Sequence, residues 1–222
     1  ASDVYKRQHD KNGNFISPAE AIPILEESGL IIPVGKWIIQ NAFSMCTECR
    51  KYYPEFRVSI NLSYVQILKS PLMMELKQII DYSGISCSGI IVELTESGYL
   101  EGTPAVRSVW NDMKQLRIQI ALDDFGTGYS NLMNISNLEP DIVKLDRGFT
   151  LKALSRSYEY QLMQYVIEMV HKLNQYVCVE GVETKEDLEK IKALGPDLIQ
   201  GYYYSKPCSR DEFLKKFFDY SE

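Results

Sequence analysis

The sequence predicts an α/β fold in which parallel strands close into a β/α barrel. Short apolar runs alternate with longer amphipathic stretches, and each run is continuously apolar, as in parallel strands buried on both faces. Polar or charged residues stand near the C-terminal ends of six successive runs. A barrel brings all these ends to one face, whereas a doubly wound sheet gathers functional residues only at its switch point. The even pattern therefore favours the barrel.

The expected strands share a short length and a high apolar content. They are bounded by residues of turn and helix-capping type, which limits each strand to a few residues. The expected strands are 57–62, 90–95, 118–123, 142–145, 177–179 and 198–202.

The segments between these strands carry helix-capping signals. Gly29 is placed to end the first helix, and Pro23 is expected to kink that helix or split it. Other signals have the spacing of a capping box, in which a Ser or Thr and an acid three residues later each accept a backbone N–H. These pairs are Ser17 with Glu20, Thr184 with Asp187, and Ser209 with Glu212.

The composition is that of an ordinary globular protein. The 222 residues include 24 Lys and Arg against 30 Asp and Glu, which gives a net charge of −6, and 45% of the residues are hydrophobic. These values exclude a disordered chain, and the acidic balance argues against DNA as a partner. No stretch approaches the ~20 apolar residues of a membrane span, and no signal-peptide pattern opens the chain.

The five cysteines form an odd, scattered set that does not resemble a secreted disulfide framework. Cys46 and Cys49 have the Cys-x-x-Cys spacing of some zinc and redox sites, but no second ligand pair accompanies them. They share a helix face with Ile38, Ala42 and Met45, so we expect them to pack in the core. Reduced thiols favour a cytoplasmic location, either of the whole protein or of the cytoplasmic part of a larger membrane-anchored signalling protein.

The first residues stand apart from the rest of the chain. Residues 1–8 include the run Asp-Val-Tyr-Lys-Arg-Gln, which resembles the translated end of a sequencing adapter. We therefore expect residues 1–8 to be a non-native scar and residues 9–222 to form one domain, since no linker or low-complexity segment divides them.

The residues at the strand ends share a chemistry. Asn61, Glu93, Asp123, Asp124 and Glu180 all offer oxygen donors. Carboxylates packed together without a cation would repel one another and raise each other's pKa. Oxygen donors without His or Cys suit Mg²⁺ or Mn²⁺ rather than Zn²⁺. Two adjacent Asp can reach one site only where the strand pleat breaks, and such a pair can serve two ions, a recurring device for phosphoester hydrolysis.

Each strand-end residue also has an ordinary structural interpretation. Asn61 suits a turn or a helix cap, Glu93 and Glu96 have capping-box spacing, and the glycines after Asp124 suit a tight turn. Lys144 suits a solvated strand edge. These interpretations do not explain why all the residues stand at strand ends. We therefore favour a site, in which Lys144 would orient the attacking water or offset phosphate charge.

Taken in order, these motifs closely resemble those of the EAL-domain family of bacterial cyclic-di-GMP phosphodiesterases. The resemblance runs from about His9 to the C-terminus. Any one motif is weak, but the ordered set is specific. The motifs are Asn61-Leu-Ser, Glu93-Leu-Thr-Glu96, Asp123-Asp-Phe-Gly-Thr-Gly128, Lys144-Leu-Asp146, Glu180-Gly-Val-Glu183 and Gln200-Gly-Tyr.

The resemblance implies a modified TIM (β/α)8 barrel that hydrolyses cyclic di-GMP to linear pGpG with two Mg²⁺ or Mn²⁺ ions. Lys144 would position water, and Glu180 would act at the second ion or as the base. The implied metal ligands are Asn61, Glu93, Asp123, Asp124 and Glu180, and the implied catalytic residues are Lys144, Glu180, Asp124 and Gln200. The residues implied to support the loops are Glu96, Gly126, Gly128 and Glu183. The residues implied to bind substrate are Asp146, Arg147 and Gln200.

The start of the chain departs from the family pattern. The family is named for a Glu-Ala-Leu strand that supplies another metal ligand, and a nearby Arg contacts the substrate phosphate. Neither precedes His9. We therefore expect an incomplete barrel that lacks its two opening strands, with unpaired backbone at the open seam and with impaired activity.

Three functional classes remain at this point. The first is a cyclic-di-GMP phosphodiesterase, which lowers the level of this second messenger. The second is a catalytically inactive cyclic-di-GMP receptor or protein-interaction module. The third is another metal-dependent barrel enzyme that acts on a carbonyl or sugar substrate, and the presence of only 2 His argues against it. The resemblance implies cyclic di-GMP as the ligand and a homodimer as the assembly.

Overall fold

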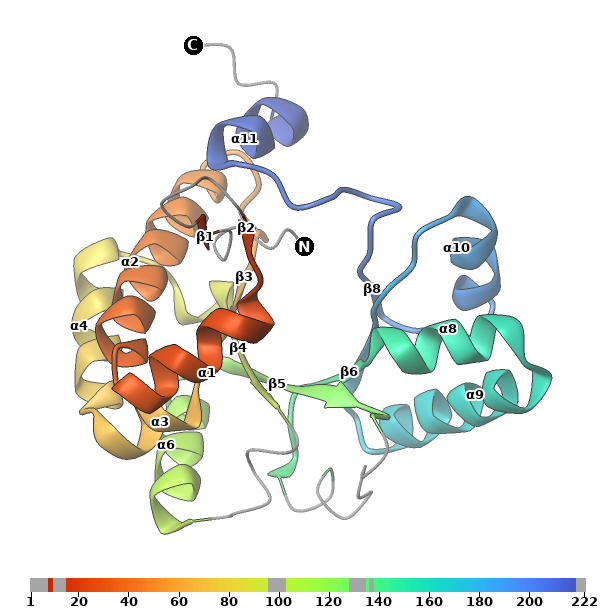
Figure 1. The fold of residues 1–222 in the computed structure, drawn as a ribbon, viewed down its shortest axis with the longest axis horizontal. Coiled ribbons are helices and arrows are strands. Elements are labelled where there is room, and N and C mark those ends of the chain that lie inside the picture. Colours follow the sequence, from red (N-terminus) through yellow and green to blue (C-terminus); the bar gives the residue numbers. More distant parts are fainter. Residues whose placement is uncertain (1–7, 10–14, 96–102, 128–134, 136–137, 219–222) are drawn as a thin grey trace. The chain divides into compact units, whose positions relative to one another are not determined.

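The structure is a computed structural model that describes residues 8–9, 15–95, 103–127, 135 and 138–218 (Figure 1). Near the start of the chain, β1 (Gln8–His9) pairs antiparallel with β2 (Phe15–Ile16) in a small sheet of its own. Residues 1–7 lie outside the described residues, so the scar over residues 1–8 stays a prediction.

Among the described residues, the larger sheet has six strands, whose order follows the chain from β3 to β8. The pairings from β5 to β8 are parallel, as predicted from the continuously apolar runs. All four residues of β6 are buried. The strands are β3 (Val58–Asn61), β4 (Ile90–Thr95), β5 (Gln119–Phe125), β6 (Ile142–Leu145), β7 (Tyr176–Val179) and β8 (Leu198–Ile199).

The chain divides into two compact units. The first consists of residues 1–92, 102–118 and 207–222, and the second consists of residues 93–101 and 119–206. The described helices of the first unit are α1 (Pro18–Ser28), α2 (Ile31–Cys49), α3 (Tyr64–Lys69), α4 (Leu72–Ser83), α6 (Pro104–Gln115) and α11 (Arg210–Phe218), with a 3-10 turn at Cys87–Gly89. Those of the second unit are α8 (Arg147–Ser155), α9 (Ser157–Lys172) and α10 (Lys185–Lys192).

The predicted caps set several helix ends. Thr184 and Asp187 form the full capping box at the start of α10, since each side chain accepts the other's backbone N–H. Gly29 closes α1 with a φ of 75°, a conformation that glycine adopts at little cost. Pro23 lies inside α1, which continues to Ser28. The helix is therefore not split, because a proline removes one helical hydrogen bond without preventing the later ones.

The cysteines of α2 pack in the core of the first unit, as predicted. The Cys46 and Cys49 side chains are fully buried and form no disulfide. Cys49 belongs to a cluster in which Met45 packs with Phe213 and Leu214 of α11. Burial raises the pKa of both thiols to about 11, which keeps them protonated at neutral pH.

Thiol alkylation tests this packing. Burial also raises the pKa of Cys178 to about 12, whereas Cys87 and Cys208 are partly exposed. We expect iodoacetamide at pH 8 to label Cys87 and Cys208 at least about tenfold faster than Cys46, Cys49 and Cys178, because the thiolate is the reactive form. Peptide mass spectrometry measures the rates, with the urea-unfolded chain as the control. Equal rates at Cys46 and Cys87 in the folded chain would contradict the burial described here.

The described helices also bear on membrane association. Within the described ranges, no helix combines the length and the apolar character needed to cross a membrane.

Candidate active site

A break in the pairing of β5 brings two adjacent carboxylates to one place. Leu122 pairs with Val143 and Phe125 pairs with Leu145, so Asp123 and Asp124 together stand opposite the single residue between those partners on β6. Two residues opposing one define a β-bulge, which interrupts the alternation of side chains. The predicted break in the pleat is therefore present, and the residue opposite the two Asp is Lys144.

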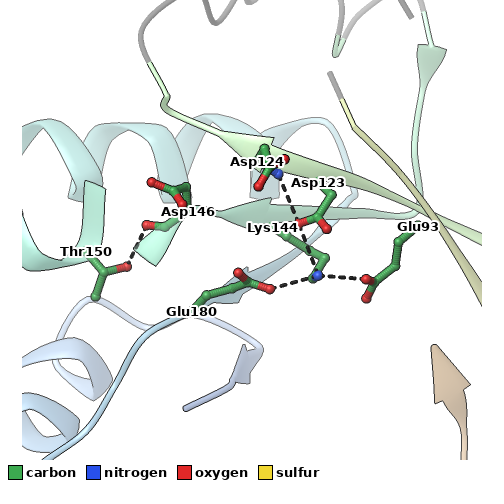
Figure 2. A network of polar contacts seen from close by, with 7 residues as sticks. All are labelled: Glu93, Asp123, Asp124, Lys144, Asp146, Thr150 and Glu180. Carbon is green, nitrogen blue, oxygen red and sulfur yellow. Dashed lines mark hydrogen bonds and ion pairs between the residues drawn. The ribbon is translucent and has the colours of Figure 1, made fainter. Parts of the chain in front are cut away.

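Lys144 is the centre of a charge cluster in the second unit (Figure 2). Its Nζ lies 2.9 Å from Glu93 Oε2 of β4, 3.0 Å from Asp123 Oδ1 of β5, and 2.7 Å from Glu180 Oε1, just after β7. The Lys144 side chain is only 7% exposed, and the three acidic side chains are 9%, 12% and 20% exposed respectively. Residues from successive strands thus converge at the carboxyl ends of the sheet, as in the sites of β/α barrels.

Burial and opposing charges compete at this cluster. Burial disfavours the Lys144 ammonium, but the three neighbouring carboxylates outweigh it and raise the pKa of Lys144, so this residue stays charged. At Glu180, burial raises the pKa, and the attraction of Lys144 only partly offsets that rise. The cluster therefore holds one fixed positive charge and a carboxyl group that takes up a proton more readily than usual.

Asp124 lies beside this cluster with an unusual backbone. Its φ is 60°, in the left-handed region, and its N–H donates to Asp123 Oδ1 at 2.9 Å (Figure 2). Asp and Asn tolerate this conformation better than most residues. Asp124 is exposed near the end of β5, but its partial desolvation raises its pKa, and the nearby Asp123 and Asp146 charges raise it further. In Figure 2 the Asp124 side chain stands apart from the Lys144 ammonium, and no dashed line joins the two.

Two loops in this unit are fixed by polar contacts. Asp146 caps α8, because its Oδ1 accepts from the N–H of Gly148 at 2.7 Å and of Phe149 at 3.3 Å. The next residue, Arg147, donates to Glu183 Oε1 from Nε at 3.2 Å and from Nη2 at 2.7 Å. This ion pair joins the segment after β6 to the segment after β7. Both residues were expected near the site from the sequence, but their ion pair was not predicted.

Backbone contacts hold the segment that contains Gln200. The Gln200 N–H donates to Val179 O at 2.8 Å, and Gln200 O accepts from Val182 N at 3.3 Å. A Cβ on Gly201 would clash with the backbone of Val182, so only glycine fits there. At Gly126, with a φ of 103°, a Cβ would meet Phe149. Both glycines therefore permit close approach of the loops around the cluster.

The predicted site residues meet different outcomes. Glu93, Asp123, Lys144 and Glu180 come together, with Asp124 beside them. Asn61 is the last residue of β3 in the first unit, where its side chain is exposed, and its role as a ligand stays a prediction. The roles of Asp146, Arg147, Glu183, Gly126 and Gln200 also stay predictions. Glu96 and Gly128 lie outside the described residues.

The donor set fits a hard divalent cation by its chemistry. The acidic groups of the cluster are carboxylates, which are ligands that Mg²⁺ and Mn²⁺ prefer. Their mutual repulsion is relieved only when a positive charge lies among them. In this structure that charge is the Lys144 ammonium (Figure 2). Across the part of the chain that the structure describes, no group of three or more His, Cys, Asp or Glu side chains is already arranged to hold a metal ion.

The parallel sheet and the charge cluster define a class: an α/β protein of the β/α-barrel type, with an acidic site at the carboxyl ends of its strands. Comparison with known families identifies the member of that class. Residues 3–207 match the EAL domain family, and the chain belongs to this family.

Two curated relatives from one organism are named as cyclic di-GMP phosphodiesterases. The chain is 30% identical over 205 residues to the cyclic di-GMP phosphodiesterase PdeF of Escherichia coli K12, a match that covers 92% of this chain and 27% of PdeF. It is 33% identical over 193 residues to PdeR of the same organism, with 87% of this chain and 29% of PdeR covered. The chain thus spans less than a third of the length of these relatives.

Solved structures show the same fold. The EAL enzyme Bd1971, in a form with cAMP and cyclic di-GMP bound, superposes with a TM-score of 0.89 at 29% identity, covering 95% of this chain and 58% of Bd1971. The phosphodiesterase PaMucR in complex with cyclic di-GMP gives a TM-score of 0.86 at 26% identity, covering 94% of this chain and 85% of PaMucR. The predicted α/β fold, an incomplete TIM-like barrel, is confirmed.

Proposed function

We propose that this chain is a phosphodiesterase domain that uses Mg²⁺ or Mn²⁺ to hydrolyse cyclic di-GMP to linear pGpG. The observation that carries the proposal is the cluster around Lys144, in which buried carboxylates from successive strands face one cation position. A purely structural ion pair would need one carboxylate, whereas surplus buried acids are costly unless they serve a ligand.

The metal ligands follow from the donor chemistry. Glu93, Asp123, Asp124 and Glu180 would hold the ions, and Asn61 is proposed as a further ligand on the family resemblance. When bound, two divalent ions would supply positive charge for the attacking and leaving oxygens of the phosphodiester.

The protein's own residues would move the proton and direct the substrate. Hydrolysis requires a water to lose a proton as it attacks phosphorus. Glu180 is proposed as the base, because burial raises its pKa above that of an exposed glutamate and so strengthens its hold on a proton. Lys144 keeps its charge, so it would donate hydrogen bonds but would not act as the base. Asp146, Arg147 and Gln200 are proposed to contact substrate, and the Arg147–Glu183 pair would hold the adjoining loops in place.

Turnover of cyclic di-GMP tests the proposal. The purified chain is incubated with cyclic di-GMP and Mg²⁺ or Mn²⁺, and chromatography separates the substrate from pGpG. We expect pGpG to form with either ion and its formation to stop when EDTA removes the ion. Circular dichroism before and after EDTA shows whether the chain is still folded.

Two other outcomes have clear meanings. Binding of cyclic di-GMP by the folded chain without turnover would replace the enzyme with a receptor. Neither binding nor turnover in a folded chain would refute the proposed function of this domain.

The assembly is proposed on the family resemblance alone, and the location on that resemblance and on the free cysteines. We propose a homodimer in the cytoplasm, where a second-messenger phosphodiesterase meets its substrate. Sedimentation velocity of the chain at micromolar concentration tests the assembly, and a single species of monomer mass would overturn it.

A further inference from the structure

We propose that the Lys144 ammonium is the resident cation of the metal-free site, and that a divalent ion enters by exchange with it. This inference rests on the metal site proposed above. It gives Lys144 a function apart from the positioning of water, namely to keep the unloaded site folded and to compete with the incoming ion.

The geometry of the cluster supports the exchange. The ammonium is in direct contact with Glu93, Asp123 and Glu180, each within 3.0 Å (Figure 2). These are three of the carboxylates that would bind metal. The ammonium therefore stands among the proposed ligands themselves, at a position that the three oxygens already surround.

The charge of the cluster explains why a resident cation is needed. Three carboxylates and one ammonium leave two negative charges in a region where side chains are 7% to 20% exposed. Without Lys144 the same region would keep its three carboxylates but lose the ammonium that contacts all of them. Buried charges that lose their partner destabilise a fold strongly.

The sizes of the two kinds of cation explain why they compete. The three oxygens lie 2.7–3.0 Å from Nζ, whereas Mg²⁺ binds oxygen at about 2.1 Å. To bind the ion, the oxygens must draw together by roughly 0.6–0.9 Å, and the ammonium must withdraw because like charges repel. The flexible four-carbon stem of lysine allows that movement.

Three variants test the exchange. Lys144→Met removes the charge and keeps much of the side-chain volume. The double variant Lys144→Met with Glu180→Gln removes one charge of each sign, so the cluster regains its original net charge. Lys36→Met is the matched control, because Lys36 pairs with Glu75 at 2.9 Å on the surface of the first unit and is 40% exposed.

The measurements are melting temperature in EDTA, melting temperature in saturating Mn²⁺, and Mn²⁺ affinity by calorimetry. In EDTA, Lys144→Met is expected to melt about 10 °C below the unchanged chain, and the double variant to recover most of that loss. Saturating Mn²⁺ should restore most of the loss in Lys144→Met. Its affinity for Mn²⁺ should rise at least about tenfold, because the ion no longer displaces a cation. Lys36→Met should match the unchanged chain in every measurement.

Several results would overturn the inference. One is a melting loss in Lys144→Met that is the same in Mn²⁺ as in EDTA, which would make Lys144 a structural residue in both states. Another is an unchanged or weaker affinity for Mn²⁺. A third is a double variant as unstable as Lys144→Met, because the loss would then come from packing rather than charge. If Lys144→Met folds only when purified in Mn²⁺ and unfolds on chelation, the inference is supported; if it folds in neither condition, the inference fails.

The same data separate this inference from the proposed function. If the unchanged chain binds no Mn²⁺ and turns over no cyclic di-GMP, both fail. If the unchanged chain binds Mn²⁺ and produces pGpG while Lys144→Met lacks the expected stability and affinity pattern, only the exchange fails.

Discussion

Asp123→Asn is expected to lower the turnover of cyclic di-GMP by at least about a hundredfold, the scale on which loss of a group that supports charge at the reacting centre acts. Asp123 is buried and lies 3.0 Å from Lys144 Nζ. An amide has the same shape as the carboxylate, and its oxygen still accepts from Lys144 and from the Asp124 N–H. The variant therefore loses the charge that a divalent ion needs but keeps its hydrogen bonds.

The measurement is pGpG formation at saturating Mn²⁺, together with the melting temperature. The matched control is Asp81→Asn, since Asp81 is exposed on α4 in the first unit and should leave both values unchanged. An Asp123→Asn variant that is folded and keeps more than a tenth of the activity would show that this carboxylate is not a metal ligand.

Asp124→Asn is expected to lower the turnover of cyclic di-GMP but to stabilise the metal-free chain. Turnover should again fall by at least about a hundredfold, because the variant loses a carboxylate proposed to bind the second ion. The melting temperature in EDTA at pH 7 should rise slightly, because partial desolvation and the Asp123 and Asp146 charges disfavour the ionised Asp124, while its exposure to solvent screens that effect. Asparagine also tolerates the φ of 60° at this position.

The pH dependence of that gain follows from the raised pKa. A carboxyl whose pKa is higher in the folded chain than in the unfolded chain binds its proton more tightly when folded. The stability it contributes is fully present below the unfolded value of about 3.9 and is lost as the pH rises through the folded pKa. The advantage of Asp124→Asn should therefore be largest near pH 7 and should shrink toward zero as the pH falls to about 4.

Thermal unfolding in EDTA across this pH range checks the trend. In saturating Mn²⁺ the order should reverse, because the unchanged chain gains more from the ion. If Asp124→Asn melts lower than the unchanged chain at pH 7 in EDTA, the Asp124 carboxylate stabilises the metal-free fold, opposite to what its surroundings indicate.

Much of the sheet could be predicted because buried parallel strands leave a strong local pattern. The expected strands 90–95 and 142–145 match β4 and β6 in both bounds. The last expected strand, 198–202, is too long, because β8 ends at Ile199. After it the backbone bonds to Val182, which belongs to another loop, and Gly201 packs against that residue. Such contacts depend on segments distant in sequence, so local pattern does not reveal them.

The sequence predicts which residues form the charge cluster, but it does not predict which of their side chains contact one another. Strand-end position and residue type were enough to gather Glu93, Asp123, Asp124, Lys144 and Glu180. The sequence did not indicate that Lys144 contacts three of these acids at once, because that contact depends on the distances between strands and on the reach of the lysine side chain. The partnership of Arg147 and Glu183 was missed for the same reason.

The bulge in β5 has a consequence for how this chain can vary. Leu122 and Phe125 are each in register with β6, and they are separated by one residue more than their partners are. Deleting either Asp would make the β5 segment from Leu122 to Phe125 as long as its partner segment on β6. The strand could then still pair with β6, but the site would lose one carboxylate. Substitution at Asp123 or Asp124 changes one donor group and keeps the bulge, whereas a one-residue deletion removes the bulge itself. The number of residues between Leu122 and Phe125 is therefore as much a part of the site as their identity.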